Sequence, residues 1–308
     1  MNTLIDDVTA WDLVRAVPAG IPAQPGGTRV YHDPSPDVWL QVRTSGRWEA
    51  SAPLTLAATD LFELYLPLQL RADLVIGQTG QSLDGRIATE NGESHYITGP
   101  ADIRRLHRLR ALVDAVVVGA GTIAADNPRL TVRHVDGSNP VRIVLDPGGR
   151  LDPTHHVFSD GAAPTLVVRS TSVTRAPPMP GIRTLSLSST KAGGFDPHHL
   201  VQALQDLGHR RLLIEGGGTT VSRFLQAGAL DRLHVTVAPL LIGSGRPSVE
   251  LARIDSLAQA IRPPCRVFHL DDDILFDLEL RSPPAASADE EDHRTRQRGE
   301  QHEQAVRD

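Results

Sequence analysis

The sequence predicts an α/β protein with a largely parallel sheet. From residue 74 onward, short apolar runs rich in β-branched residues recur as they do in buried strands, and amphipathic stretches typical of helices lie between them. Strands that alternate with helices are typical of parallel sheets, because the chain must run from the end of one parallel strand back to the start of the next, usually through a helix. The expected strands are residues 74–76, 114–119, 141–145, 165–168, 211–214 and 233–237.

Two of the expected helices have recognisable starts. Thr98 is placed to cap a helix in which Pro100 stands near the first position. Asp196 and Pro197 open another helix, which is expected to stop at Gly208. The apolar positions of the first helix are Ile103, Leu106, Leu109 and Leu112, and those of the second are Leu200, Val201, Leu204 and Leu207.

The composition divides the chain into an N-terminal extension (1–70), a main domain (71–281) and a polar tail (282–308). In the extension, β-prone residues flank Thr44-Ser45-Gly46, which predicts a hairpin. The extension is either an accessory module or lid over a site, or a segment packed on the main domain. The tail has no apolar periodicity and many charges, and this predicts disorder.

The composition of the 308-residue chain is that of a soluble globular protein, with 40% hydrophobic and 22% charged residues. A single cysteine, Cys265, excludes an internal disulfide framework and the cysteine pair that a zinc-dependent base deaminase needs. We expect no metal site, no membrane span and no secretory signal, and therefore a cytoplasmic protein, because no long apolar run occurs and the N-terminus is acidic.

The net charge of −6 belongs to the two ends of the chain. Residues 1–70 carry 4 basic and 8 acidic residues and residues 282–308 carry 4 and 7, whereas residues 71–281 carry 23 and 22. A broad basic surface for nucleic acid is therefore not expected. The near-neutral main domain can still bind anionic ligands through individual arginines.

Two glycine-rich turns follow predicted strands. Gly119-Ala120-Gly121 leads into a helix-like segment that starts at Thr122, and Glu215 precedes three consecutive glycines at residues 216–218. Taken alone, the first sequence is explained by a tight strand-to-helix turn that binds no ligand. Two such loops in one α/β domain favour ligand binding, because ligands bind outside the carboxyl ends of parallel strands, where the loops are expected to meet.

Other polar segments have both a functional and a structural interpretation. Residues 82–88 and 92–98 form either a substrate-orienting loop or a polar surface loop. Arg110 and Arg133 are candidates for bidentate phosphate recognition. The other arginines of the same helix, Arg104, Arg105 and Arg108, are expected on its solvated face.

In order, these segments resemble the reductase domain of the bifunctional riboflavin-biosynthesis deaminase-reductase family. The resemblance covers roughly residues 71–281 and implies a dihydrofolate-reductase-like fold, with three layers, α/β/α, around a mostly parallel sheet. Its motifs are Ser82-Leu83-Asp84-Gly85-Arg86, Gly92-Glu93-Ser94, Ile97-Thr98, Leu109-Arg110-Ala111, Val118-Gly119 with Thr122, Asp126-Asn127-Pro128 through Arg133, Asn139-Pro140-Val141-Arg142, Glu215-Gly216-Gly217 and residues 238–243.

The resemblance implies an oxidoreductase that uses NADPH to reduce the ribosyl group of 5-amino-6-(5-phosphoribosylamino)uracil, or of its 2,5-diamino pyrimidinone analogue, to the ribitylamino form. Hydride would reach C1′ of the ring-opened imine. The implied substrate contacts are Ser94, Arg110, Leu130, Arg133 and Glu215, with both arginines on the phosphate and Glu215 as the catalytic residue. The implied NADPH contacts are Gly80, Tyr96, Thr122, Asp126, Gly217, Gly218, Thr219, Thr220, Val221, Ser222 and Arg223.

Three positions depart from the family pattern, since Tyr96 stands where relatives often have Trp, Arg86 where some have Lys, and Gly218 where Pro is frequent. The deaminase half is missing, so we expect reduction only, in a homodimer, before or after a separate deamination. Two alternatives stay open: a dihydrofolate or pterin reductase on the same fold, and a non-catalytic ligand-binding relative. Arg110 and Arg133 favour a phosphorylated substrate, and the retained polar groups argue against a non-catalytic relative.

Overall fold

The computed structural model describes residues 4–21, 27–94, 96–174, 179–191 and 193–281. The predicted disorder of residues 282–308 lies outside these ranges. The chain forms two compact units, a smaller one that contains Met1–Ala72 and a larger one, Asp73–Arg281. Among the described residues, no helix has both the length and the hydropathy that a bilayer-spanning segment needs.

The smaller unit combines two helices with an antiparallel three-stranded sheet. Its elements are α1 (Asp7–Ala16), β1 (Thr28–His32), β2 (Ser35–Val42), β3 (Trp48–Ala50) and α2 (Leu56–Gln69). The predicted hairpin is confirmed by the antiparallel pairing of β2 with β3. Asp6 caps α1 and Thr55 caps α2. Neither helix was expected from the sequence.

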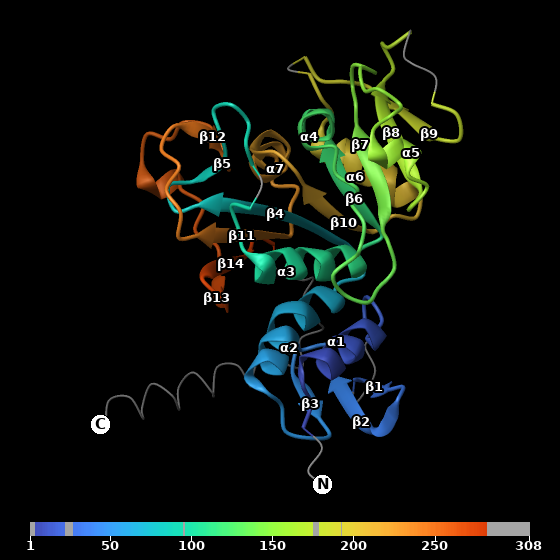
Figure 1. Ribbon diagram of the computed structural model, residues 1–308, viewed down its shortest axis with the longest axis vertical. Coiled ribbons are helices and arrows are strands. Elements are labelled where there is room, and N and C mark those ends of the chain that lie inside the picture. The colour runs from blue at the N-terminus through green and yellow to red at the C-terminus, as the bar shows by residue number, and fades with distance from the viewer. Residues whose placement is uncertain (1–3, 22–26, 95, 175–178, 192, 282–308) are drawn as a thin grey trace. The chain divides into compact units, whose positions relative to one another are not determined.

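The larger unit is built on a nine-stranded sheet in the order β13-β14-β11-β4-β10-β6-β7-β8-β9 (Figure 1). All neighbours pair in parallel except β14, which is antiparallel to β11 and β13. The strands are β4 (Leu74–Ser82), β6 (Ala115–Gly119), β7 (Val141–Leu145), β8 (Thr165–Ser170), β9 (Arg183–Leu187), β10 (Arg211–Glu215), β11 (Arg232–Ala238), β13 (Cys265–Leu270) and β14 (Asp273–Glu279). All six predicted strands are confirmed.

Five helices and a small ribbon complete the larger unit. They are α3 (Pro100–Ala111), α4 (Ala120–Asp126), α5 (His156–Ser159), α6 (Pro197–Asp206), α7 (Gly218–Gln226), the strand pair β5 (Arg86–Thr89) and β12 (Gly245–Pro247), and a short 3-10 turn, η1 (Leu257–Gln259). Asp196 caps α6 as predicted. The prediction that Thr98 caps α3 was wrong: the cap residue is Gly99, because the helix begins at Pro100, and the Thr98 hydroxyl bonds to Asp102 instead.

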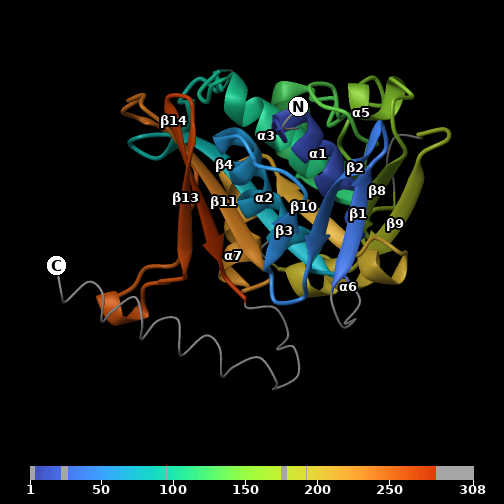
Figure 2. The ribbon, with the colours of Figure 1, turned by 90° about the horizontal axis from the view of Figure 1, so that it is seen from below.

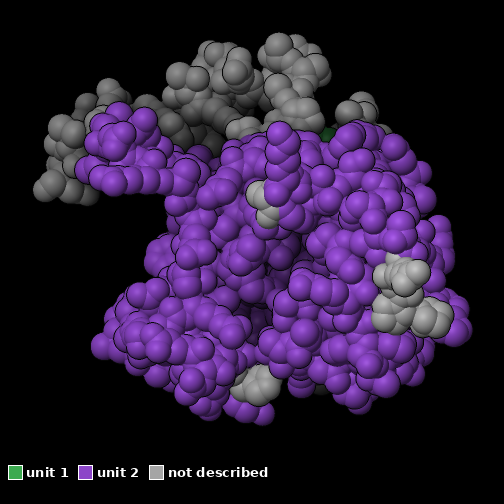
Figure 3. Space-filling view, turned by 90° about the horizontal axis from the view of Figure 1, so that it is seen from above, with its two compact units in different colours: residues 1–72, 282–308 green, residues 73–281 purple. Residues whose placement is uncertain are grey.

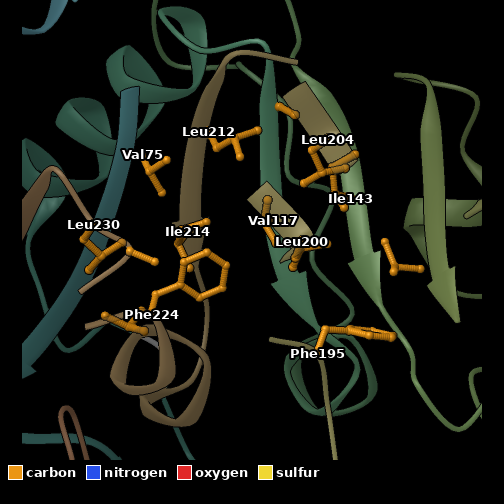
Figure 4. Close-up of a cluster of buried hydrophobic side chains, with 14 of the residues drawn as sticks. Val75, Val117, Ile143, Phe195, Leu200, Leu204, Leu212, Ile214, Phe224 and Leu230 are labelled. Atoms are coloured by element: carbon orange, nitrogen blue, oxygen red, sulfur yellow. The ribbon is translucent and has the colours of Figure 1, made fainter. Parts of the chain in front are cut away.

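The sheet is the middle of three layers, as the predicted fold class requires. Helix α3 lies on one face, and α6 and α7 lie on the other (Figures 1 and 2). Leu212 and Ile214 of β10 pack against Leu204 of α6 and Phe224 of α7 in one hydrophobic core (Figure 4). This packing fixes both β10 and α7. It therefore also fixes the short loop that joins the end of β10 to the start of α7.

Candidate active site

The two glycine loops meet at the carboxyl ends of adjacent parallel strands. Strand β6 leads into α4, strand β10 leads into α7, and β6 pairs directly with β10. The Gly217 backbone N–H donates a hydrogen bond of 2.9 Å to the Thr122 hydroxyl. The predicted meeting of the loops is therefore confirmed, because adjacent parallel strands deliver both loops to the same edge.

The loops interlock through their glycines and threonines. A methyl group on Gly216 would lie 2.7 Å from Thr122 Oγ1, and one on Gly119 would lie 2.8 Å from Thr220 Oγ1. Gly216 also has a φ of +106°, a conformation that favours glycine. In each loop, a glycine without a side chain thus leaves space for a threonine of the other loop.

Gly218 is required for a different close approach. A methyl group there would lie 2.4 Å from the Pro247 carbonyl oxygen and 2.5 Å from that of Ser248. Glycine at this position lets α7 begin directly against the chain that leaves β12. This backbone contact gives a physical reason for the departure from proline noted in the sequence.

The N-terminus of α7 has no side-chain cap. Gly217 is its cap residue, Thr219 is exposed, and Thr220 is half-buried. Uncapped amides at a helix N-terminus favour an anionic ligand group. Of the other predicted cofactor residues on α7, Arg223 is exposed, Val221 belongs to the hydrophobic core and the Ser222 hydroxyl accepts from the Glu250 N–H at 2.8 Å, so the last two side chains face the protein.

Arg110 of α3 and Glu215 at the end of β10 form a buried, bidentate pair. Arg110 Nε lies 2.9 Å from Glu215 Oε1, and Arg110 Nη2 lies 2.7 Å from Glu215 Oε2. Arg110 Nη1 donates to the Thr131 carbonyl oxygen at 3.2 Å. Two residues that the sequence placed separately on the substrate are therefore joined to each other beside the glycine loops.

The segment after α4 is held in an irregular conformation by side chains from elsewhere in the unit. Leu130 is buried with a φ of +56°, which is uncommon for a residue with a branched side chain. The buried Arg142 donates to the Arg129 carbonyl oxygen at 3.3 Å, and the Arg133 N–H donates to His107 Nδ1 at 2.9 Å. These contacts fix the positions of Arg129 and Arg133.

Positive charge accumulates at this segment, where Arg129 interacts electrostatically with Asp160, a carboxylate that forms its ion pair of 2.7 Å with Arg142. Burial, together with the charges of Arg110 and Arg133, lowers the pKa of His107 to about 3, so His107 is neutral and accepts at Nδ1. Burial, Arg110 and Arg129 lower the pKa of Arg133. In the described part of the chain, neither Arg129 nor Arg133 forms an ion pair with a carboxylate. Such a cluster favours binding of a phosphate.

A pocket of about 180 Å³ lies beside β4 and the start of α3. Three predicted site residues, Gly80, Ser94 and Tyr96, are among those that line it. Tyr96 is 89% exposed with a φ of +63°, and the Ser94 hydroxyl donates to Asp126 at 3.2 Å. The larger unit is visibly hollowed on the side shown in Figure 3. The full lining is Gln78, Gly80, Ile87, Ser94, Tyr96, Ile97, Thr98, Asp102, Ile103 and Leu106.

The expectation that Arg105 lies on a solvated face was wrong, whereas Arg104 is exposed as predicted. Arg105 is 1% exposed and donates to Asp102 at 2.7 Å and to Gln78 at 2.9 Å. A charged pair three residues apart resembles an ordinary surface ion pair of a helix, which is why the sequence did not single out Asp102. Its position on the same side of α3 as the buried Leu109 was the available signal.

The Ser82–Arg86 motif forms a rigid turn. The Ser82 hydroxyl donates to Asp84 at 2.6 Å, and the other Asp84 oxygen accepts from the Gly243 N–H. These hydrogen bonds lower the pKa of Asp84 to about 2. They support the structural interpretation of this motif, since Asp84 ties the β4–β5 turn to the chain near Gly243. Within the described ranges, no group of three or more acidic, histidine or cysteine side chains is placed to hold a metal ion.

Comparison with known proteins gives a consistent set of matches. The family model for the RibD C-terminal domain matches residues 73–269. A 2,5-diamino-6-ribosylamino-4(3H)-pyrimidinone 5′-phosphate reductase from Methanothermobacter thermautotrophicus is 38% identical over 216 residues, which cover 67% of this chain and 98% of that protein.

Two solved structures share the fold and part of the sequence. Acinetobacter baumannii RibD superposes with a TM-score of 0.59 and 30% identity over 74% of this chain and 65% of that one. A Thermotoga maritima diaminohydroxyphosphoribosylaminopyrimidine deaminase/5-amino-6-(5-phosphoribosylamino)uracil reductase has a TM-score of 0.58 and 25% identity over 74% and 64%. The chain thus spans less than two thirds of each of these two proteins.

Proposed function

The chain belongs to the RibD C-terminal domain family, and we propose that it reduces the ribosyl group of a phosphorylated ribosylaminopyrimidine to a ribitylamino group with NADPH, a step of riboflavin biosynthesis. The archaeal relative is named as a reductase of such a compound and is matched over almost its whole length. One observation carries the proposal: the Arg110–Glu215 pair connects the glycine-rich start of α7, which has no side-chain cap, with the segment that carries Arg129 and Arg133, through the bond from Arg110 to the Thr131 carbonyl oxygen.

The residues at the glycine loops fit a dinucleotide cofactor. Gly217, Gly218, Thr219 and Thr220 surround the uncapped N-terminus of α7, where backbone amides would hold phosphate oxygens. Thr122 and Asp126 of α4 would contact the cofactor from the neighbouring loop, and Gly80 and Tyr96 would contact its nicotinamide end at the pocket. NADPH supplies a hydride when it is bound.

Arg133 and Arg129 bind the 5′-phosphate of the substrate in this proposal. Their guanidinium groups repel each other, and among the described residues neither forms a direct ion pair with a carboxylate, since Asp160 interacts with Arg129 but pairs with Arg142; a bound phosphate therefore offsets the repulsion. The buried anchors His107 and Arg142 keep the arginine segment in place. The phosphate end of the substrate is thereby held while the ribosyl carbon is aligned for reduction.

Glu215 is the catalytic residue in this proposal. Its carboxylate is fixed by two hydrogen bonds from Arg110 and lies next to Gly216 and the start of α7. A fixed carboxylate near the ribosyl group stabilises the positive charge of a protonated imine and orients its N–H. Leu130 and Ser94 complete the substrate contacts that the family resemblance implies, from the arginine segment and from the pocket.

We further propose a cytoplasmic homodimer. The exposed free thiol of Cys265 suits a reducing compartment. Several large apolar side chains between the end of β11 and the middle of β13 are exposed and suit a contact between subunits. They are Leu241, Leu251, Ile254, Leu257 and Val267.

The decisive experiment is a direct assay of the purified chain. With NADPH and either 5-amino-6-(5-phosphoribosylamino)uracil or its 2,5-diamino pyrimidinone analogue, we expect substrate-dependent loss of nicotinamide absorbance and formation of the ribitylamino product. Dihydrofolate, which carries no phosphate for Arg133, serves as the control and is expected to give no oxidation. Oxidation with dihydrofolate alone would contradict the proposed substrate class.

A further inference from the structure

The proposed cofactor has a defined direction across the sheet. Its diphosphate lies at the start of α7, after β10, and its nicotinamide end lies at the pocket beside β4. Strand β4 is on one side of β10, and β6 and then β7 are on the other side (Figure 1). The adenosine half of an extended dinucleotide therefore lies towards the end of β7, about 10 Å from the end of β10 at about 4.8 Å per strand.

The turn after β7 begins with a carboxylate, Asp146. In dinucleotide-binding sheets, an acidic residue at the end of the neighbouring strand accepts a hydrogen bond from the ribose 2′-hydroxyl and so favours NADH. Asp146 is 0% exposed, and its two oxygens accept from the Arg150 and Leu151 N–H groups, each at 3.1 Å. The carboxylate is thus used to close the turn and does not face a ligand.

The charged group that the same turn exposes is the guanidinium of Arg150. The Arg150 side chain lies back across the turn, since a methyl group on Gly148 would lie 3.1 Å from Arg150 Nε and 3.4 Å from its Cγ and Cδ. In the ranges that the structure describes, no carboxylate forms an ion pair with Arg150. The turn therefore hides its negative charge and presents a positive one.

The ends of the next two strands place neutral hydroxyl groups beside this turn. The Ser170 N–H donates to the Pro147 carbonyl oxygen at 3.3 Å, so the end of β8 lies against the turn. The buried Ser170 hydroxyl holds the exposed hydroxyls of Ser172 and Ser189 at 2.8 and 2.9 Å. Residues 169–174 and 187–191 contain no acidic residue, so these strand ends carry no carboxylate that would repel an anion at the turn.

We propose that Arg150 binds the 2′-phosphate of the adenosine ribose, so that the turn after β7 selects NADPH over NADH. This assignment rests on the proposed function. A guanidinium can donate two parallel hydrogen bonds to a phosphate and also neutralises its charge, whereas a 2′-hydroxyl offers no charge to pair with. Asp146 in an open turn would favour the opposite cofactor, and its burial is what reverses the preference.

The test is calorimetric binding of adenosine 2′,5′-bisphosphate and adenosine 5′-monophosphate, which differ only in the 2′-phosphate. We expect the unaltered protein to bind the bisphosphate about tenfold or more tightly, the scale of a hydrogen bond to a charged group. Arg150→Ala should bring this ratio close to unity. The matched control, Arg183→Ala, removes an exposed arginine at the amino end of β9, on the opposite edge of the sheet, and should leave the ratio unchanged. Equal affinities in the unaltered protein, or an unchanged ratio in R150A, would overturn the assignment.

Two further variants separate the roles of the two charged residues. Arg150→Glu places a carboxylate where the 2′-phosphate would lie, so it should weaken NADPH binding and leave NADH binding almost unchanged, as measured by nicotinamide fluorescence. Asp146→Asn alters the carboxylate inside the turn and should leave the ratio of NADPH to NADH affinity unchanged, even if it lowers stability. A ratio that changes in D146N but not in R150E would place the carboxylate, not the guanidinium, at the ribose.

The binding measurements need no pyrimidine, so the two proposals can fail separately. Binding of the bisphosphate that depends on Arg150, together with no reduction of either pyrimidine, would contradict the proposed function and support the phosphate subsite. Reduction with equal kcat/KM for NADPH and NADH would support the proposed function and overturn the subsite.

Discussion

Arg110 and Glu215 lie 105 positions apart in the sequence and meet through two parallel hydrogen bonds of 2.9 and 2.7 Å. The third guanidinium nitrogen of Arg110 is used by the Thr131 carbonyl oxygen. The pair therefore joins α3, the end of β10 and the arginine segment at one point. In this arrangement Arg133, rather than Arg110, has its charge available for a phosphate.

Arg110→Met should destabilise the fold because it leaves the Glu215 carboxylate buried without its partner. Removal of one member of a buried ion pair typically costs about 3–5 kcal/mol. Urea unfolding measures the change. The double variant Arg110→Met/Glu215→Gln removes the orphaned charge as well and should recover part of the loss. A double variant that is less stable than either single one would contradict the pairing.

Glu215→Gln should lower kcat strongly and change NADPH affinity little. The amide keeps the size of the side chain but removes the negative charge that we place next to the reacting ribosyl group. Steady-state kinetics measure the first effect, and a fluorescence titration of NADPH binding measures the second. Parallel losses in turnover and cofactor affinity would place Glu215 at the cofactor instead.

Arg133→Ala should raise KM for the phosphorylated substrate, by about tenfold or more, and leave kcat less affected, because the phosphate serves to bind and align the substrate. The matched control is Arg104→Ala, which removes an exposed arginine of α3. Added salt should raise KM in the unaltered protein and raise it less in R133A. Equal small effects of the two substitutions would mean that the phosphate lies elsewhere.

His107→Asn should make folding stability less dependent on pH. The folded-state pKa of His107 is about 3, below the ordinary value of 6.5, so the unfolded chain takes up a proton that the folded protein refuses. The contribution is complete above pH 6.5 and is lost as the pH falls towards 3, by at most about 1.4 kcal/mol per pH unit. Urea unfolding at several pH values measures the slope.

The asparagine in this variant keeps an acceptor for the Arg133 N–H without taking up a proton. If H107N is less stable than the unaltered protein at pH 7, the difference between their free energies of unfolding should therefore become smaller as the pH falls. Identical slopes for the two proteins would show that His107 titrates normally in the fold.

Gly216→Ala should destabilise the larger unit by about 1 kcal/mol or more, because its φ is +106° and the added methyl group would lie 2.7 Å from Thr122 Oγ1. Gly121→Ala is the control, since no heavy atom lies within 4 Å of its added methyl group and it stands in helix α4. Alanine there should be neutral or stabilising. Thermal unfolding of both variants tests the interlocked loops.

Much of the larger unit was predictable from the sequence, because its central strands are buried on both sides. Continuous apolar runs at β4, β6, β7, β8, β10 and β11 mark such strands directly. The edge strands β9 and β13 contain only exposed and half-buried residues and have no continuous buried apolar run, and the sequence did not single them out. Helix α2 was missed for another reason, since its apolar residues follow no clear stripe and Pro67 lies inside it.

By itself, the sequence determined the parallel α/β sheet, the glycine loops at the ends of β6 and β10, and their meeting. These features depend on local patterns and on the rule that adjacent parallel strands end at the same edge. Only the tertiary structure decided how the charges pair. Arg110 binds Glu215, and Arg105 is buried against Asp102, because α3 packs its charged side onto strand residues far away in the sequence. The pairing of Arg110 with Glu215 and the burial of the Asp102–Arg105 pair depend on contacts with strand residues more than 100 positions away, which the spacing along α3 does not contain.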